Sequence, residues 1–159
     1  MISDFVSLIY PSICCACGRA LHKHEQCMCS FCRYHLPKTN YHLDNVNPLS
    51  KLFWGRVDIQ SASAFFYFDK GSKVQNLIHH LKYGGHKEIG NALGFIYGRE
   101  LIKSEYYKDI DLVIPVPLHP KKLKKRGYNQ SDYFAMGLAN GLGSNWLANG
   151  LSRTSDSQT

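Results

Sequence analysis

A cluster of cysteines near the start of this chain is the feature that most constrains its fold. All six cysteines of the 159-residue sequence lie between positions 14 and 32. Four of them form two CxxC pairs, Cys14/Cys17 and Cys29/Cys32, with 11 residues between the pairs. Each pair can form a turn that offers two thiolates to one tetrahedral Zn²⁺, and four thiolates close a structural site. We therefore expect structural zinc, which keeps folded a segment too short to build its own core.

Other assignments of this cysteine-rich segment remain open from the sequence. Cys15 would allow a shifted pairing, whereas Cys27 with Cys29 gives only a cramped CxC. A set of free or redox-active thiols is the interpretation without a metal. Three histidines are alternative metal ligands in the same region: His22, His24 and His35.

Composition and charge indicate which kinds of molecule this chain could bind. Hydrophobic residues make up 44% of the sequence, which is enough for a packed core. The chain carries 19 Lys+Arg against 12 Asp+Glu, a formal charge of +7. That balance favours phosphate-bearing partners, but it does not distinguish a nucleotide from a nucleic acid.

The sequence has no apolar run near the roughly 20 residues that a bilayer span needs. The segment MISDFVSLIYPS lacks the basic start of a secretory signal, and its apolar residues predict a short helix over 2–10. We therefore expect a cytoplasmic protein. Clustered cysteines in that compartment usually indicate metal or redox chemistry.

The second strong constraint is the stretch DLVIPVPLHPKKLKKRGYNQ, from Asp111 to Gln130. Its apolar, mostly β-branched run at 112–116 predicts a strand buried on both faces, which Pro115 and Pro117 end. We expect a basic loop next, then a helix capped by Asn129 or Ser131. The residues expected to bind an anion are Lys121, Lys122, Lys124, Lys125, Arg126, Gly127, Asn129 and Gln130.

A buried strand that ends in a basic loop and a helix N-terminus has the outline of an anion site. Open α/β sheets bind ligands at the carboxyl ends of their strands, and a helix N-terminus favours phosphate. The alternative interpretation is a run of charges that are merely solvated.

Periodicity and turn residues predict the remaining elements. His79, His80 and His86 invite a metal interpretation, but Glu88 is the only acidic residue nearby, so we predict surface or packing histidines. The predicted elements are a short helix at 48–53, a strand at 61–68, helices at 74–81 and 89–103, a helix at 131–142 ended by Gly141 and Gly143, and a strand at 146–151.

The order PVPLHP, basic residues and RGYNQ resembles the signature of the ComF family, competence-related proteins with a phosphoribosyltransferase-like domain. Tyr128 replaces the family's usual Phe, and Lys122 stands near a usual Arg. The paired CxxC motifs followed by Leu36-Pro37, the segment LIHHLKYGG and the tail SRTSDSQT are similar as well. The resemblance covers essentially the whole chain.

This resemblance implies an α/β fold, in which a small N-terminal zinc-ribbon or knuckle module precedes a partial type I phosphoribosyltransferase-like, Rossmann-like parallel sheet with helices. The implied divisions are 1–37 for the N-terminal helix and Cys₄ module, 38–58 for a connector, and 59–159 for the partial transferase-like domain. The implied ligand is phosphoribosyl pyrophosphate or a related phosphate, with Mg²⁺ if the full-length protein is active. Arg153 would be a catalytic residue on a mobile loop.

Type I phosphoribosyltransferases bind phosphoribosyl pyrophosphate with an acidic pair followed by a TTG loop. This part of the family pattern is missing here, because the sequence contains no Asp-Asp pair and no TTG. We expect a chain that stops in mid-pattern at Thr159 and has no transferase activity alone.

Two functions compete. The first is a phosphoribosyltransferase-like protein linked to DNA uptake and competence, incomplete here. The second is a non-catalytic protein that binds single-stranded DNA and acts with competence proteins. A truncated, poorly functional product is the third interpretation.

Overall fold

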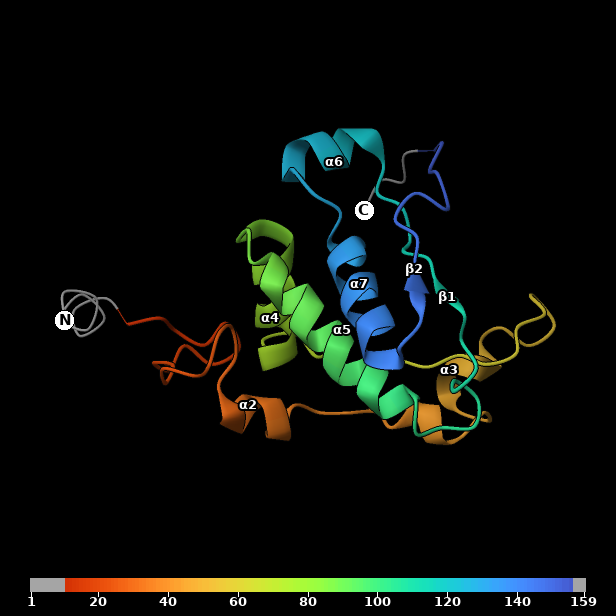
Figure 1. Ribbon diagram of the computed structural model, residues 1–159, viewed down its shortest axis with the longest axis horizontal. Helices are drawn as coiled ribbons and strands as arrows, with labels where there is room; N and C mark the ends of the chain where they lie inside the picture. Colours follow the sequence, from red (N-terminus) through yellow and green to blue (C-terminus); the bar gives the residue numbers. More distant parts are fainter. Residues whose placement is uncertain (1–10, 156–159) are drawn as a thin grey trace. The chain divides into compact units, whose positions relative to one another are not determined.

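The computed structural model describes residues 11–155, so the helix expected over 2–10 lies outside the described residues (Figure 1). The chain divides into two compact units. The first comprises Met1–Lys38 and Phe66–Ile89, and the second comprises Thr39–Phe65 and Gly90–Thr159.

In the first unit, a cysteine-rich loop leads into helix α2 (Ser30–His35), and helix α4 (Lys73–Tyr83) follows later in the chain. Helix α4 confirms the helix predicted at 74–81. It begins at Ser72, whose side chain accepts a hydrogen bond from the Gln75 N–H. Leu77, which is 1% exposed, lies on the buried face of α4, as the apolar periodicity requires.

The strand predicted at 61–68 is wrong. Its first residues are extended without a ladder, and Phe66 makes one isolated antiparallel bridge with Lys38. The Tyr67 N–H also donates to the Pro37 carbonyl at 2.9 Å. Because Pro37 has no N–H of its own, this neighbouring stretch cannot extend the pairing into a sheet.

The second unit confirms the helices predicted at 48–53, 89–103 and 131–142. Helix α5 begins in the last residues of the first unit and continues into the second. The elements of the second unit are the 3₁₀ helix η1 (Tyr41–Leu43), α3 (Pro48–Lys51), α5 (Lys87–Leu101), β1 (Leu112–Val113), α6 (Pro120–Arg126), α7 (Gln130–Leu142) and β2 (Asn145–Trp146).

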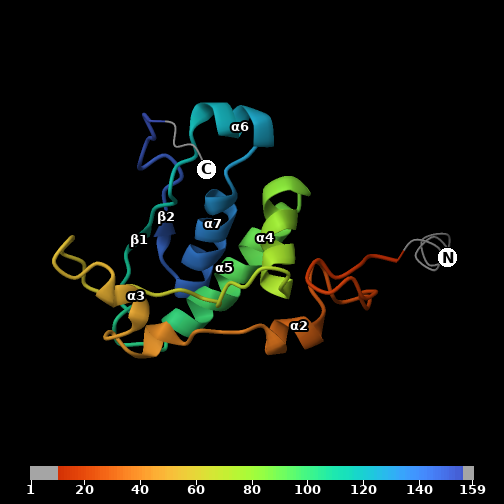
Figure 2. The same ribbon diagram turned by 180° about the vertical axis from the view of Figure 1, so that it is seen from behind.

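The core of the second unit forms where α5 and α7 lie side by side, as both views show (Figures 1 and 2). Tyr97, Leu101 and Leu142 are buried there. The Phe65 ring stacks on Tyr97 with centroids 4.5 Å apart, and the Tyr97 hydroxyl donates to Ser63 at 2.6 Å. The segment before α4 is therefore attached to α5 by both apolar and polar contacts.

Glycines bring the backbones of α5 and α7 into direct contact. A Cβ atom at Gly98 would lie 2.5 Å from the Leu138 carbonyl oxygen, and one at Gly141 would lie 2.5 Å from the Phe95 carbonyl oxygen. No larger residue fits at either position without moving a helix. Gly141 therefore serves packing and does not end α7 as predicted, whereas Gly143 does end it, with φ of +77°.

The predicted buried strand at 112–116 is shorter and more exposed than expected. Strand β1 is two residues long and pairs in parallel with β2, Leu112 opposite Asn145. Ile114 and Val116 are exposed, Val116 at 68%. Within residues 11–155, β1 has a single neighbouring strand, and Leu112 is 43% exposed, so β1 is not the strand buried within a larger sheet that the sequence predicted.

The basic segment predicted as a loop is the helix α6. Pro120 stands at its first position, where the missing N–H costs nothing, and the His119 side chain accepts from the Lys121 N–H at 3.3 Å. Lysine, leucine and arginine favour helices, and Gly127 ends α6 with φ of +80°. Local propensity thus outweighs the repulsion between neighbouring cations.

The described residues form a mixed fold of helices and a small parallel two-stranded sheet, with the cysteines clustered in the first unit. None of the helices within 11–155 combines the length and apolar character that crossing a bilayer requires.

Candidate functional site

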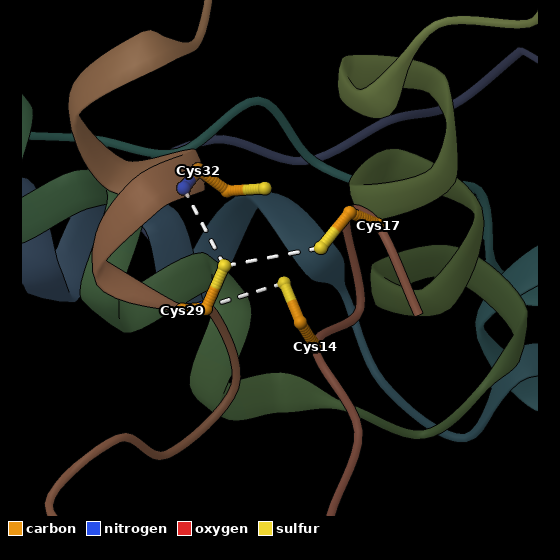
Figure 3. A group of neighbouring side chains, drawn as sticks. All are labelled: Cys14, Cys17, Cys29 and Cys32. Carbon is orange, nitrogen blue, oxygen red and sulfur yellow. Dashed lines mark hydrogen bonds between the residues drawn. The ribbon is translucent and has the colours of Figure 1, made fainter. Parts of the chain in front are cut away.

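The four cysteines of the two CxxC pairs come together in the first unit (Figure 3). Their Sγ atoms all lie within 4.8 Å of one another. Cys14 and Cys17 come from the loop before α2, Cys29 is the residue that caps α2, and Cys32 lies in its first turn. Two short stretches of chain therefore bring two cysteines each into one cluster. That these cysteines are the metal ligands stays a prediction.

Backbone hydrogen bonds shape each pair. In the first, the Gly18 N–H donates to the Cys14 carbonyl at 2.8 Å, and Gly18 adopts φ of +75°, which suits glycine. In the second, the Cys29 side chain accepts from the Cys32 N–H at 3.5 Å. The Cys29 N–H itself donates to Cys14 Sγ at 3.3 Å and so joins the two pairs.

The spacing of the sulfurs fits a tetrahedral metal. Zn–S bonds of about 2.3 Å in a tetrahedron put sulfurs about 3.8 Å apart. The Sγ atoms of Cys17 and Cys29 are 3.8 Å apart. Cys14, Cys29 and Cys32 are buried, Cys32 completely, so their thiols are shielded from solvent oxidants. The cluster can therefore bind a metal such as zinc.

The thiols of this cluster differ in pKa. Burial raises the pKa of Cys14, but N–H groups of Cys29, Cys17 and Ala16 outweigh it and lower that pKa to about 7. Burial, followed by the neighbouring thiols, raises the pKa of Cys32 well above its ordinary value. A cation among the sulfurs would offset the effects of burial and of the neighbouring thiols, because it favours the thiolate form of all four cysteines.

The alternative ligands weighed from the sequence lie elsewhere. His35 is hydrogen-bonded through Nδ1 to the Phe31 carbonyl at 2.8 Å. His22 and His24 line a cavity of about 230 Å³ that Cys29 also borders, but neither histidine belongs to the group of four cysteines. Glu25 fixes the loop between the two cysteine pairs, since its carboxylate accepts from the His22 and Ser30 N–H groups. The hydrogen bond from His22, and then those from Ser30, lower the pKa of Glu25 to about 2.

In the second unit, the residues predicted to bind an anion lie together on α6 and at the start of α7. Asn129 caps α7 by accepting from the Ser131 N–H at 3.2 Å, and its Nδ2 donates to the Val116 carbonyl at 3.1 Å. Gln130 accepts from Arg126. These contacts join the segment after β1, α6 and α7 in one place.

Arg153 lies in the last described segment of the chain. Its Nε donates to the Ser155 carbonyl at 3.1 Å. This local contact gives no support to a catalytic role, which stays a prediction.

An aromatic cavity beside α6 is a feature that the sequence analysis missed. It encloses about 330 Å³ and is lined by Leu123, Tyr128, Asn129, Asp132, Tyr133, Met136 and Trp146. Tyr128 and Tyr133 meet edge to face at 5.7 Å. The i, i+4 spacing of Asp132 and Met136 on α7 was visible in the sequence, but the contribution of Trp146 depends on the pairing of β2 with β1.

Burial makes the carboxyl group of Asp132 unusual. Its Oδ1 atom is buried and accepts no hydrogen bond from the part of the chain that the structure describes. Burial also raises the pKa of this carboxyl. A buried carboxyl oxygen without a donor carries an uncompensated desolvation cost.

The comparisons with known proteins identify relatives with one shared name. The chain is 29% identical to the DNA utilization protein YhgH of Shigella flexneri over 153 residues, and 28% identical to that of Escherichia coli K12 over 153 residues. Each match covers 94% of this chain and 63% of the relative, so the chain spans less than two thirds of those proteins. The protein of that name from Salmonella typhi is 31% identical over 80 residues, which is 48% of this chain and 35% of the relative.

No protein-family model matches the chain. No solved structure matches it significantly.

The cysteine cluster yields the first prediction. A Cys14→Ser/Cys29→Ser variant should hold one metal equivalent less than the wild type and should unfold at a lower temperature, because a metal bound by these cysteines would contribute directly to folding. Elemental analysis and thermal unfolding would measure both. Cys27→Ser, which changes a buried cysteine outside the cluster, is the matched control. An unfolding temperature that EDTA leaves unchanged in the wild type would contradict a structural metal.

Proposed function

We propose that this protein handles single-stranded DNA in DNA uptake, with the second unit as its DNA-binding surface and the cysteine cluster as a structural metal centre. The observation that carries the proposal is the position of the cationic helix α6 beside an aromatic cavity. The name of the relatives, DNA utilization protein, supports the same direction. Competence proteins are the partners that this role implies.

Helix α6 would bind the phosphate backbone. Lys121, Lys124 and Lys125 are exposed and stand at i, i+3 and i+4, so they share one face of the helix. Such a row can follow successive phosphates of one strand and gives affinity without sequence preference. Leu123 lines the cavity, so the apolar side of the same helix adjoins it.

The cavity would hold a base. Its size is at the lower end of the range of ligand pockets, about 300–1,000 Å³. Trp146 is 39% exposed and offers a ring for stacking on a base. Stacking on an aromatic side chain contributes roughly 1–3 kcal/mol per base.

The metal in the cysteine cluster is Zn²⁺ in this proposal, because four thiolates at tetrahedral spacing are its typical structural ligands. The cytoplasm is the compartment in which we place the protein, since reduced, clustered cysteines bind metals there. The divisions 1–37, 38–58 and 59–159 remain our proposal for how the sequence is organised.

A second candidate is a phosphoribosyltransferase-like function. The observation in its favour is the connection between the parallel strands β1 and β2 through α6 and α7, the kind of unit from which Rossmann-like sheets are built. Phosphoribosyl pyrophosphate with Mg²⁺ would then bind after β1, at α6 and the capped start of α7. Arg153 would contribute to catalysis.

We predict that replacing Lys121, Lys124 and Lys125 with Ala weakens binding of single-stranded DNA and flattens its salt dependence. Each lost phosphate contact lowers the log–log slope by about 0.7, so three contacts lower it by about 2. Fluorescence anisotropy with a labelled oligonucleotide across a salt series measures the slope.

The matched control for this charge change replaces Lys51, Lys103 and Lys108, which are exposed lysines of the same unit outside α6. The control should keep the wild-type slope. Equal losses in both triple variants would show that total charge, and not the face of α6, governs binding.

We predict that Trp146→Ala lowers affinity for single-stranded DNA by about 5- to 150-fold while leaving the salt slope unchanged, because stacking is lost and phosphate contacts are kept. Trp54→Ala is the control, since Trp54 is exposed in the same unit and lines a different cavity. Wild-type affinity in Trp146→Ala would remove the cavity from the proposed interface.

We predict that this chain binds phosphoribosyl pyrophosphate only very weakly, because its sequence lacks the acidic pair and TTG loop of the type I transferases. Calorimetric titration in the presence of Mg²⁺ measures the affinity. Micromolar binding that the Lys121/Lys124/Lys125 variant loses would favour the second candidate over the first.

A further inference from the structure

The first unit contains a second group of side chains with metal-binding geometry, separate from the four-cysteine cluster. Cys15, His80 and His86 each offer one ligand atom, and these atoms lie within 4.8 Å of one another. Cys15 is buried, and the two histidines are partly exposed. From the sequence, Cys15 offered only a shifted pairing among the cysteines, and the histidines were predicted to be surface or packing residues, so this group was not predicted.

The fold builds this group from three stretches of the unit. Cys15 is held by a hydrogen bond from its N–H to the Cys27 carbonyl at 3.0 Å. The loop that carries it is attached to α4 by Asn76, whose Nδ2 donates to the Ala16 carbonyl at 3.0 Å. His80 lies in the last turn of α4, on the same helix as Asn76.

A tight turn after α4 returns His86 to His80. Gly85 adopts φ of +75°, and the Gly84 N–H donates to the His80 carbonyl at 2.9 Å. A Cβ atom on Gly84 would lie 3.1 Å from Cδ2 of His86, so glycine leaves room for that ring. The two imidazole rings then stand 5.4 Å apart at 79°. Two ligands thus come from one helix end and its turn, and the third comes from the cysteine loop.

Glu88 orients one of these ligands. The Nδ1 atom of His86 lies 2.7 Å from Glu88 Oε1, which leaves Nε2 as the nitrogen that Glu88 does not engage. Histidines that bind metals typically have their other ring nitrogen hydrogen-bonded to a carboxylate in this way. The pair is about half exposed, so it adds little stability as a simple ion pair.

We propose that Cys15, His80 and His86 bind a second divalent transition-metal ion, best matched by Zn²⁺, with a fourth position open to water. One thiolate and two imidazoles are a ligand set that zinc accepts, and three protein ligands leave a coordination position free. This metal would crosslink the cysteine loop to α4 and the turn before α5. With three ligands, two of them partly exposed, it exchanges more readily than the metal held by four thiolates.

The experiment is a metal count on the 159-residue chain without an affinity tag, loaded with Zn²⁺ and freed of excess by gel filtration. The wild type is expected to hold two equivalents. His80→Ala and His86→Ala are each expected to hold one. His79→Ala is the matched control, because His79 is the adjacent histidine of α4, is exposed and belongs to neither group, and it should hold two.

Titration of the metal-free chain with Co²⁺ gives a second readout that requires no variant. The first equivalent fills the four-thiolate site. The second is expected to add sulfur-to-cobalt charge-transfer absorption of roughly one quarter the intensity, because one thiolate replaces four. In the histidine variants the first spectrum should persist, which reports an intact cysteine cluster, and the second should be absent.

Two results would overturn the proposal. One is a wild type that binds a single equivalent of Zn²⁺ and gives no further charge-transfer absorption after one equivalent of Co²⁺. The other is a second equivalent that persists in both His80→Ala and His86→Ala, since it would then bind elsewhere. The proposal does not depend on DNA binding, so these outcomes leave the proposed function unaffected.

Discussion

The crowding of four cysteine sulfurs within 4.8 Å is the constraint on which the first unit depends. Buried thiolates this close repel one another, so the arrangement favours a cation that offsets their charge. Few apolar side chains could stabilise this unit instead, because five of its buried side chains in the described residues are cysteines. Hydrocarbon contacts such as those of Leu77 and Ile89 continue this core in α4 and at the start of α5. A metal bound by the four cysteines would thus replace part of the apolar core that a larger domain would possess.

The second unit depends on a different constraint, the close approach of α5 and α7 through glycines such as Gly98 and Gly141. This contact fixes the axis of α7, and the start of α7 is fixed in turn by the hydrogen bond from Asn129 to the Val116 carbonyl, in the segment after β1. The aromatic cavity and α6 therefore lie at the end of a rigid helix. A rigid support is what a binding surface needs to hold aromatic and charged groups in register.

The sequence predicted those parts of the molecule that local patterns specify. The paired CxxC motifs indicated that four cysteines could come together, and the apolar spacing around Leu77 and Tyr97 indicated helices that the structure confirms. Contacts between residues distant in the sequence could not be predicted from local patterns. Nothing local to Cys15 indicates that it meets His80, because that contact depends on how the cysteine loop packs on α4. The cavity was missed for a similar reason, since Trp146 joins it through strand pairing.

The sequence predicted a basic loop where helix α6 forms, because that prediction rested on the run of charges and not on the helix propensity of lysine, leucine and arginine. The charge of α6 also bears on the function of this helix. It has seven residues and buries none of them, so tertiary contacts add little to a helix of a length that is marginal in isolation. Its neighbouring cations repel one another at i, i+3 and i+4 spacings. A phosphate backbone laid along Lys121, Lys124 and Lys125 would remove that repulsion and stabilise the helix. The same charges that weaken α6 alone would therefore couple its order to the binding of a polyanion.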